Sequence, residues 1–235
     1  MNDSLYVLAM DQRGWLLNEL FGKEEGITAD QVAEAARAKQ VIFEGARIAL
    51  DRRGSAEGLG VLVDEQLGAE VAREVKKAGL ALAMPFERSG RPVLEPEYDN
   101  PDRLVDEFGV DLVKILIRHN VGGPEADRKL QIERLDSMIG WARGRGRPVL
   151  VELLVPATAE QNSADYDTKV RPGLTVEAID ELRDGGVKPD YWKLEGQPSV
   201  ETAKSVADAC LRGGQNPSLL VLGRSAPDEQ VRQWL

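Results

Sequence analysis

Three ionisable residues interrupt apolar segments of the chain: Lys114, Glu152 and Lys193. Each has aliphatic or aromatic neighbours, in the segments LVKIL, LVELL and YWKLE. Burial of a charged group costs free energy, so such a residue is kept either because its head group reaches water or because the group is used. A buried amine can form an imine with a carbonyl compound. The three residues therefore predict carbonyl chemistry that starts at a lysine.

Lys193 is the expected amine. It lies in the middle of residues 190–196, a short predicted strand in which it shares one face with Tyr191 and Glu195. An amine must be neutral to attack a carbonyl, and the reference pKa of a lysine, about 10.4, leaves it protonated at neutral pH. Burial and the positive charge of Lys114 are both expected to lower the pKa of Lys193.

Glu152 is the expected base. Once the imine has formed, its protonated nitrogen accepts the electrons of a breaking carbon–carbon bond, and a base takes the proton of the C4 hydroxyl. A second carboxylate, from Asp11, Asp64 or Glu87, is expected to support it. The alternative is a buried Lys-Glu-Lys network that only stabilises the interior, although desolvation offsets most of the attraction in such networks.

Seven apolar segments predict the strands that would position these side chains. They lie at residues 5–10, 60–63, 80–84, 111–117, 149–155, 190–196 and 219–222. Helical segments are expected at about residues 28–50, between the second strand and residue 79, from residue 101, and at 125–143, 175–185 and 199–212. A last helical segment is expected to run through residue 235. Thr28, Asn100 and Thr175 are the predicted N-caps, and 156–172 is predicted to be a polar loop.

The alternation of strands and helices predicts an α/β fold with a parallel sheet, namely a TIM (β/α)8-type barrel formed by one domain over residues 1–235. The seven strands are one fewer than the barrel requires, and the eighth is expected to be missing through truncation, proteolysis or its supply by a partner. A doubly wound open sheet is the alternative, although no Gly-rich dinucleotide fingerprint follows the first strand.

In a barrel, the carboxyl ends of the strands meet at one mouth. The first six strands each end in or contain an ionisable residue, in order Asp11, Asp64, Glu87, Lys114, Glu152 and Lys193. The predicted loops on that side also carry Gln12 and six basic residues, Arg13, Arg88, Arg118, Lys169, Arg171 and Arg224. This local surplus of positive charge predicts an anionic ligand, and the alternative for each basic residue is an ordinary solvated charge.

Composition excludes several classes of function. The net charge of −10 disfavours a nucleic-acid surface. Cys210 is the only cysteine, so no internal disulfide can form. The chain also has only one histidine, so a zinc site is not expected. The apolar run at 5–10 is too short for a signal peptide or a membrane span. We therefore expect a cytoplasmic protein without nucleic-acid or membrane partners.

Several segments resemble the class I tagatose-1,6-bisphosphate aldolases: LAMDQRG at 8–14, VELL at 151–154, KVRP at 169–172 and WKLE at 192–195. The chain is still more similar to the aldolase-like domain often fused to 5-dehydro-2-deoxygluconokinase of myo-inositol catabolism. That similarity is carried by VDEQ at 63–66, ERSG at 87–90, KILIR at 114–118, ELLVPAT at 152–158 and VLGR at 221–224. The resemblance runs from residue 5 to the last residue.

The resemblance implies that Lys193 forms the imine, with Glu152 and Lys114 as further catalytic residues. It also implies a retro-aldol cleavage that needs no metal or other cofactor and acts on a phosphorylated keto sugar or keto-acid sugar. The implied substrate is 2-deoxy-5-keto-gluconate 6-phosphate, split into dihydroxyacetone phosphate and malonic semialdehyde. The alternatives are tagatose 1,6-bisphosphate, a sulfonated sugar phosphate, or a non-catalytic regulatory domain that binds sugar phosphates. A homo-oligomer is left open.

Overall fold

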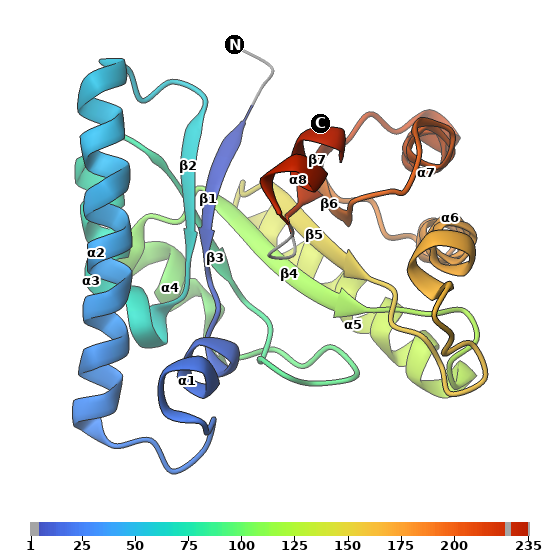
Figure 1. Cartoon of the computed structure of the whole chain (residues 1–235), viewed down its shortest axis with the longest axis horizontal. Coiled ribbons are helices and arrows are strands. Elements are labelled where there is room, and N and C mark those ends of the chain that lie inside the picture. Colours follow the sequence, from blue (N-terminus) through green and yellow to red (C-terminus); the bar gives the residue numbers. More distant parts are fainter. Residues whose placement is uncertain (1–4, 224–226, 235) are drawn as a thin grey trace. The chain divides into compact units, whose positions relative to one another are not determined.

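The computed structural model describes residues 5–223 and 227–234, and the chain forms two compact units. The first unit comprises residues 1–90 and 96–113, and the second comprises 91–95 and 114–235. The described residues contain seven strands, whose order in the sheet follows the chain from β1 to β7, with helices between them (Figure 1). This topology confirms the predicted α/β fold of the TIM-barrel type with seven strands. That one domain spans 1–235 stays a prediction.

The first unit holds three parallel strands. They are β1 (Tyr6–Met10), β2 (Leu59–Val63) and β3 (Ala81–Pro85). Met10 pairs with Val63, so β1 and β2 end at the same level and present the residues that follow them, Asp11 and Asp64, at one edge. The strands agree with their predicted positions to within one residue at each end.

Four helices belong to the first unit: α1 (Gly14–Phe21), α2 (Ala29–Arg53), α3 (Glu65–Lys77) and α4 (Pro101–Phe108). Helices α2 and α3 pack against each other (Figure 1). Leu17, Ala35 and Leu67 form a buried cluster that joins α1, α2 and α3. Helix α1 was not predicted from the sequence.

The predicted capping box of α2 is confirmed. The Thr28 hydroxyl accepts a hydrogen bond from the backbone N–H of Gln31, and the Gln31 side chain accepts one from the N–H of Thr28. Helix α4 begins at Pro101 as predicted, because proline fits the first helical turn without an N–H. The side chain of Asn100, its predicted cap, makes no capping hydrogen bond.

The second unit contains β5 (Val149–Leu154), β6 (Tyr191–Glu195) and β7 (Ser218–Leu222). Strand β4 (Leu112–Arg118) enters this unit at Lys114. Strands β5, β6 and β7 are parallel, and Glu152, Lys193 and Leu220 pair across them. Because paired residues of parallel strands point to the same face, Glu152 and Lys193 lie side by side.

The helices of the second unit are α5 (Glu125–Gly144), α6 (Arg171–Asp184), α7 (Val200–Leu211) and α8 (Asp228–Trp234), with short turns at Tyr166–Val170 and Arg212–Gly214. Helices α6 and α7 pack together (Figure 1). No helix in the described part of the chain combines the length and the apolar character that a membrane crossing requires.

The start predicted for α6 was wrong. Thr175 is not its N-cap, because the Thr175 hydroxyl donates to the carbonyl of Arg171 inside the first turn. The helix begins at Arg171, where Pro172 is tolerated because its missing N–H has no helical partner. A π-helical turn over Tyr166–Val170 leads into it, so the predicted polar loop at 156–172 is partly helical.

Gly68 interrupts the helical geometry of α3, with φ −134° and ψ 17°. A Cβ atom at this position would lie 2.2 Å from Cγ2 of Val63. We therefore expect Gly68→Ala to destabilise the protein by about 1–3 kcal/mol through overpacking, measured by urea denaturation. Gly45→Ala on the exposed face of α2, where a Cβ meets nothing within 4 Å, is the matched control and should stabilise by about 0.5–1 kcal/mol. A Gly68→Ala protein as stable as wild type would contradict this account of the kink.

Candidate active site

Two lysines and a glutamate from three consecutive strands meet in the second unit. Lys114 of β4, Glu152 of β5 and Lys193 of β6 are exposed by only 1, 4 and 7%. One oxygen, Oε2 of Glu152, lies 3.2 Å from Nζ of Lys114 and 3.1 Å from Nζ of Lys193. The sequence predicted this grouping, and the register of β5 and β6 produces it.

Lys114, Glu152 and Lys193, here called the triad, share one carboxylate and are therefore suited to proton transfer at an amine. With both amines protonated, the triad holds one surplus positive charge in a buried site, where unbalanced charge is costly. Both amines lie within hydrogen-bond reach of the same carboxylate oxygen, so a proton can pass directly between Glu152 and either lysine.

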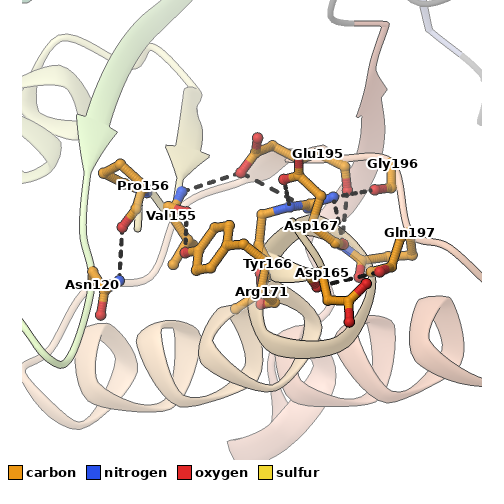
Figure 2. A network of polar contacts seen from close by, with 12 residues as sticks. Asn120, Val155, Pro156, Asp165, Tyr166, Asp167, Arg171, Glu195, Gly196 and Gln197 are labelled. Atoms are coloured by element: carbon orange, nitrogen blue, oxygen red, sulfur yellow. Dashed lines mark hydrogen bonds and ion pairs between the residues drawn. The ribbon is translucent and has the colours of Figure 1, made fainter. Parts of the chain in front are cut away.

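A second polar network surrounds Glu195 and Arg171 (Figure 2). Glu195 is two residues further along β6 and therefore faces the same side as Lys193. Its Oε2 accepts the N–H of Val155 at 3.1 Å and lies 3.9 Å from Nη1 of Arg171. Arg171 also donates to the carbonyl of Gly196 at 3.0 Å, so its guanidinium contacts both the strand end and the loop after it.

Tyr166 and Asn120 extend this network toward β4. The Tyr166 hydroxyl donates to the carbonyl of Val155 at 2.6 Å, and burial, together with the nearby Glu195 carboxylate, raises the pKa of Tyr166. The Asn120 side chain donates to the carbonyl of Pro156 at 2.7 Å. The loops that follow β4 and β5 are thus tied together by side-chain donors (Figure 2).

His119, directly after β4, is also fully enclosed. Its Nε2 lies 2.8 Å from a carboxylate oxygen of Glu181, and its Nδ1 is 3.3 Å from the side-chain nitrogen of Gln131. Because the side-chain nitrogen of Gln131 can only donate, Nδ1 of His119 is the acceptor, and the ring is arranged as a neutral imidazole with its proton on Nε2. Burial lowers the pKa of His119, against the opposing effect of Glu181. The residue joins the end of β4 to α5 and α6.

This arrangement makes stability depend on pH. Because the pKa of His119 is lower in the folded chain, the unfolded chain takes up the proton first as the pH falls below about 6.5. The neutral ring therefore contributes its full stability above that pH and loses it as the pH falls through the folded-state pKa. We expect the unfolding free energy of wild type to fall more steeply than that of His119→Gln between about pH 7.5 and 5. Parallel curves for the two proteins would contradict this.

In the first unit, Asp64 is held by partners within the protein. One oxygen caps α3 by accepting the N–H of Leu67 at 2.8 Å, and the other pairs with Lys39 of α2. Lys39 is 1% exposed and also donates to the carbonyl of Met10 at 2.7 Å. Burial lowers the pKa of Lys39, while the Asp64 carboxylate opposes this change. The lysine thereby joins the ends of β1 and β2.

Because both charges are buried, removal of one leaves the other without its counter-ion. Lys39→Met is expected to lower the free energy of unfolding by about 3–5 kcal/mol, measured by chemical denaturation. The double variant Lys39→Met with Asp64→Asn should regain much of this loss, since asparagine can still cap α3 and carries no charge. A double variant less stable than Lys39→Met alone would argue against the ion pair as the cause.

A third cluster surrounds Arg13, which is buried at the start of α1. Its guanidinium donates to the carbonyl of Glu87 at 2.9 Å and to the carboxylate of Glu87 at 3.2 Å. Glu97 lies 3.7 Å from Arg13 and 3.9 Å from Arg88, whose side chain is exposed. Two predicted ligand-binding arginines, Arg13 and Arg88, and one predicted carboxylate, Glu87, are therefore close together.

The other predicted site residues that the structure describes are more exposed than Arg13, Asp64 and the three residues of the triad. In the first unit, Asp11 is half-buried and Gln12 is exposed. In the second, Arg118 is half-buried and lies 3.4 Å from the carbonyl of Arg91, and exposed Lys169 pairs with Asp165 at 2.7 Å. Arg224 lies outside the residues that the structure describes. Within the described residues, no group of three or more His, Cys, Asp or Glu side chains is placed to hold a metal ion.

Sequence reasoning missed Lys39, Glu195 and Tyr166 as members of these networks. A signal for Lys39 exists, because it lies four residues from both Ala35 and Phe43 in the buried stripe of α2. Glu195 was predicted to share the face of Lys193, but its contacts with Val155 and Arg171 were not predicted. Tyr166 lies in a polar stretch whose path the sequence does not specify.

Comparison with known proteins identifies the family. A family model described as "Uncharacterized protein conserved in bacteria (DUF2090)" matches residues 1–235. The chain belongs to this family. A search of curated proteins gave no match.

Solved structures similar to this DUF2090 chain include several aldolases. A Schiff base forming fructose-1,6-bisphosphate aldolase has a TM-score of 0.60 at 14% identity, with 98% of this chain and 80% of that one covered. An archaeal fructose-1,6-bisphosphate aldolase, with its catalytic lysine covalently bound to the carbinolamine intermediate, has a TM-score of 0.57 at the same identity and coverage. The fructose-bisphosphate aldolase of Plasmodium falciparum has a TM-score of 0.53 at 12% identity, with 96% and 73% covered. At these identities the likeness shows a shared fold.

Proposed function

We propose that this DUF2090 protein is a class I aldolase in which Lys193 forms the imine. The observation that carries the proposal is the buried triad, in which one oxygen of Glu152 lies 3.1 Å from Nζ of Lys193 and 3.2 Å from Nζ of Lys114. The nucleophile and its base are within hydrogen-bond reach, as covalent catalysis by an amine requires.

The triad gives each step a group that can perform it. The neutral amine of Lys193 attacks the ketone to form a carbinolamine, which loses water to give a protonated imine. Glu152 then takes the proton of the hydroxyl β to the imine carbon, and the carbon–carbon bond breaks with its electron pair moving to the imine nitrogen. The aldehyde leaves, the enamine is protonated, and hydrolysis returns the free amine. Lys114 balances the charge of Glu152 when Lys193 is neutral.

The comparisons support this proposal through the fold. Two of the similar structures are described as forming a Schiff base or a lysine carbinolamine with a sugar bisphosphate. In a barrel, strand ends supply the catalytic residues. A lysine in β6 of this chain, with a carboxylate in the neighbouring strand, fits the same type of reaction.

For the substrate we propose a phosphorylated keto sugar or keto-acid sugar. The resemblance to the domain of myo-inositol catabolism favours 2-deoxy-5-keto-gluconate 6-phosphate, which would place the protein in cytoplasmic carbohydrate breakdown, and the sequence leaves a homo-oligomer open. Tagatose 1,6-bisphosphate and a sulfonated sugar phosphate are the alternatives. Anion-binding candidates are Arg88, Arg118, Lys169 and Arg224, with Asp11 and Gln12 as polar contacts. Arg13, Glu87 and Asp64, which the sequence also suggested, are buried and paired within the protein.

Reduction by borohydride in the presence of dihydroxyacetone phosphate tests the chemistry. The wild-type protein should gain one adduct, located by peptide mass spectrometry at Lys193, and Lys193→Met should gain none. Lys204→Met, at an exposed lysine of α7, is the matched control and should react like wild type. Glu152→Gln should lower the rate of cleavage by about 10²- to 10⁴-fold. Wild type without an adduct would refute the aldolase and favour a sugar-phosphate-binding regulatory domain.

Product analysis with the three sugars then identifies the substrate. All three should release dihydroxyacetone phosphate if they are cleaved. The aldehyde product differs, because it carries a carboxylate, a phosphate or a sulfonate. The sugar with the highest kcat/KM is the assigned substrate, and malonic semialdehyde is the expected aldehyde.

A further inference from the structure

The ladder between β5 and β6 ends shortly after the reactive residues. Glu152 pairs with Lys193, and the last pair of the register is Leu153 with Leu194. Val155, one residue beyond β5, is buried and still has a backbone N–H and carbonyl to satisfy. Both are satisfied by side chains: the N–H donates to Glu195, and the carbonyl accepts the hydroxyl of Tyr166. Side chains thus continue the pairing where the backbone ladder stops.

Arg171 holds the other side of this junction. Its Nη1 lies 3.9 Å from the Glu195 carboxylate that binds Val155, and its Nη2 donates to the carbonyl of Gly196. Val155 lies three residues after Glu152, and Gly196 lies three residues after Lys193. The guanidinium thus holds Glu195 and Gly196 at the end of β6, and the Glu195 carboxylate makes the link to Val155 beyond β5 (Figure 2).

These contacts argue against Arg171 as a direct ligand of an anionic substrate group. Its side chain is only 5% exposed, and its Nε donates to Asp167 at 2.9 Å. Two carboxylates, of Asp167 and Glu195, already lie against the guanidinium and would repel a phosphate. Arg171 is instead buried, and its planar guanidinium carries several N–H donors. Both properties are those of a residue that holds other groups in place.

We propose that Arg171 is a positioning residue that, through Glu195 and Gly196, keeps Lys193 and Glu152 at reactive spacing. The role in catalysis rests on the proposed aldolase function, whereas the role in spacing can be measured without it. Misplacement of reacting groups by about 1 Å can lower the rate about 100-fold. Arg171, which holds the strand ends just beyond Lys193 and Glu152, is therefore expected to have a large effect on turnover.

Arg171→Gln tests the proposal by two readouts. In its crystal structure, the distance from Nζ of Lys193 to Oε2 of Glu152 should increase from 3.1 Å to beyond about 4 Å, the limit of an ion pair. The rate of borohydride-trapped adduct formation with dihydroxyacetone phosphate should fall about tenfold or more. Added to Glu152→Gln, the same substitution should cost less than about threefold, because the spacing it maintains no longer matters. A merely structural role would give no such coupling.

Arg183→Gln is the matched control, since Arg183 lies on the same helix and pairs with Asp180 away from the triad. It should leave the distance and the adduct rate unchanged. Tyr166→Phe removes only the hydroxyl that binds Val155, so it provides the measurement if Arg171→Gln fails to fold. Its adduct rate should fall about threefold, the equivalent of one hydrogen bond.

The outcomes separate the two proposals. An unchanged distance in Arg171→Gln, or an unchanged adduct rate in Tyr166→Phe where Arg171→Gln does not fold, overturns the positioning role. An equal loss in Arg183→Gln overturns it too. If wild type forms no adduct, the aldolase proposal fails, and the crystallographic distance still decides whether Arg171 sets the spacing. Full recovery in Arg171→Lys would also overturn the role assigned to the guanidinium fork, since one ammonium cannot reproduce its geometry.

Discussion

One carboxylate oxygen between two buried amines is the constraint on which the second unit depends. Oε2 of Glu152 is within ion-pair distance of both Lys114 and Lys193, so removal of the glutamate would leave two buried amines without the carboxylate that they share. The register of β5 and β6 places the pair, and any slip by one residue would turn Lys193 to the opposite face of the sheet. The proposed chemistry therefore depends on the accuracy of the strand pairing.

Both units hold their strand ends with buried charged or polar side chains rather than with the sheet alone. Lys39 joins β1 to β2 in the first unit, and the Arg171 network joins β5 to β6 in the second. Such groups contribute little net stability, because desolvation offsets attraction, but each demands one geometry. We infer that the fold uses buried polar contacts to fix the direction of the strand ends, where a catalytic barrel carries its reactive groups.

Much of this architecture could be predicted from the sequence. The strands follow from short apolar runs, and the triad followed because single charges inside such runs are conspicuous. Helix α1 was missed because it follows β1 closely and has no capping side chain at Arg13. The start of α6 was missed because a π-helical turn has no sequence signal comparable to a capping box. Arg171 was placed on the expected side of the strands, but its partners Asp167 and Gly196 depend on the path of two loops, which local pattern does not determine.

The enclosed imidazole after β4 has a further practical consequence. The chain contains one histidine, so once the amide protons have exchanged in D2O its Hε1 signal can be assigned without ambiguity among histidines. His119 touches Glu181 of α6 and Gln131 of α5, and it adjoins the strand that carries Lys114. A ligand that shifts these elements would therefore change the chemical shift of one assigned proton, without isotope labelling of the whole chain or introduction of a foreign probe.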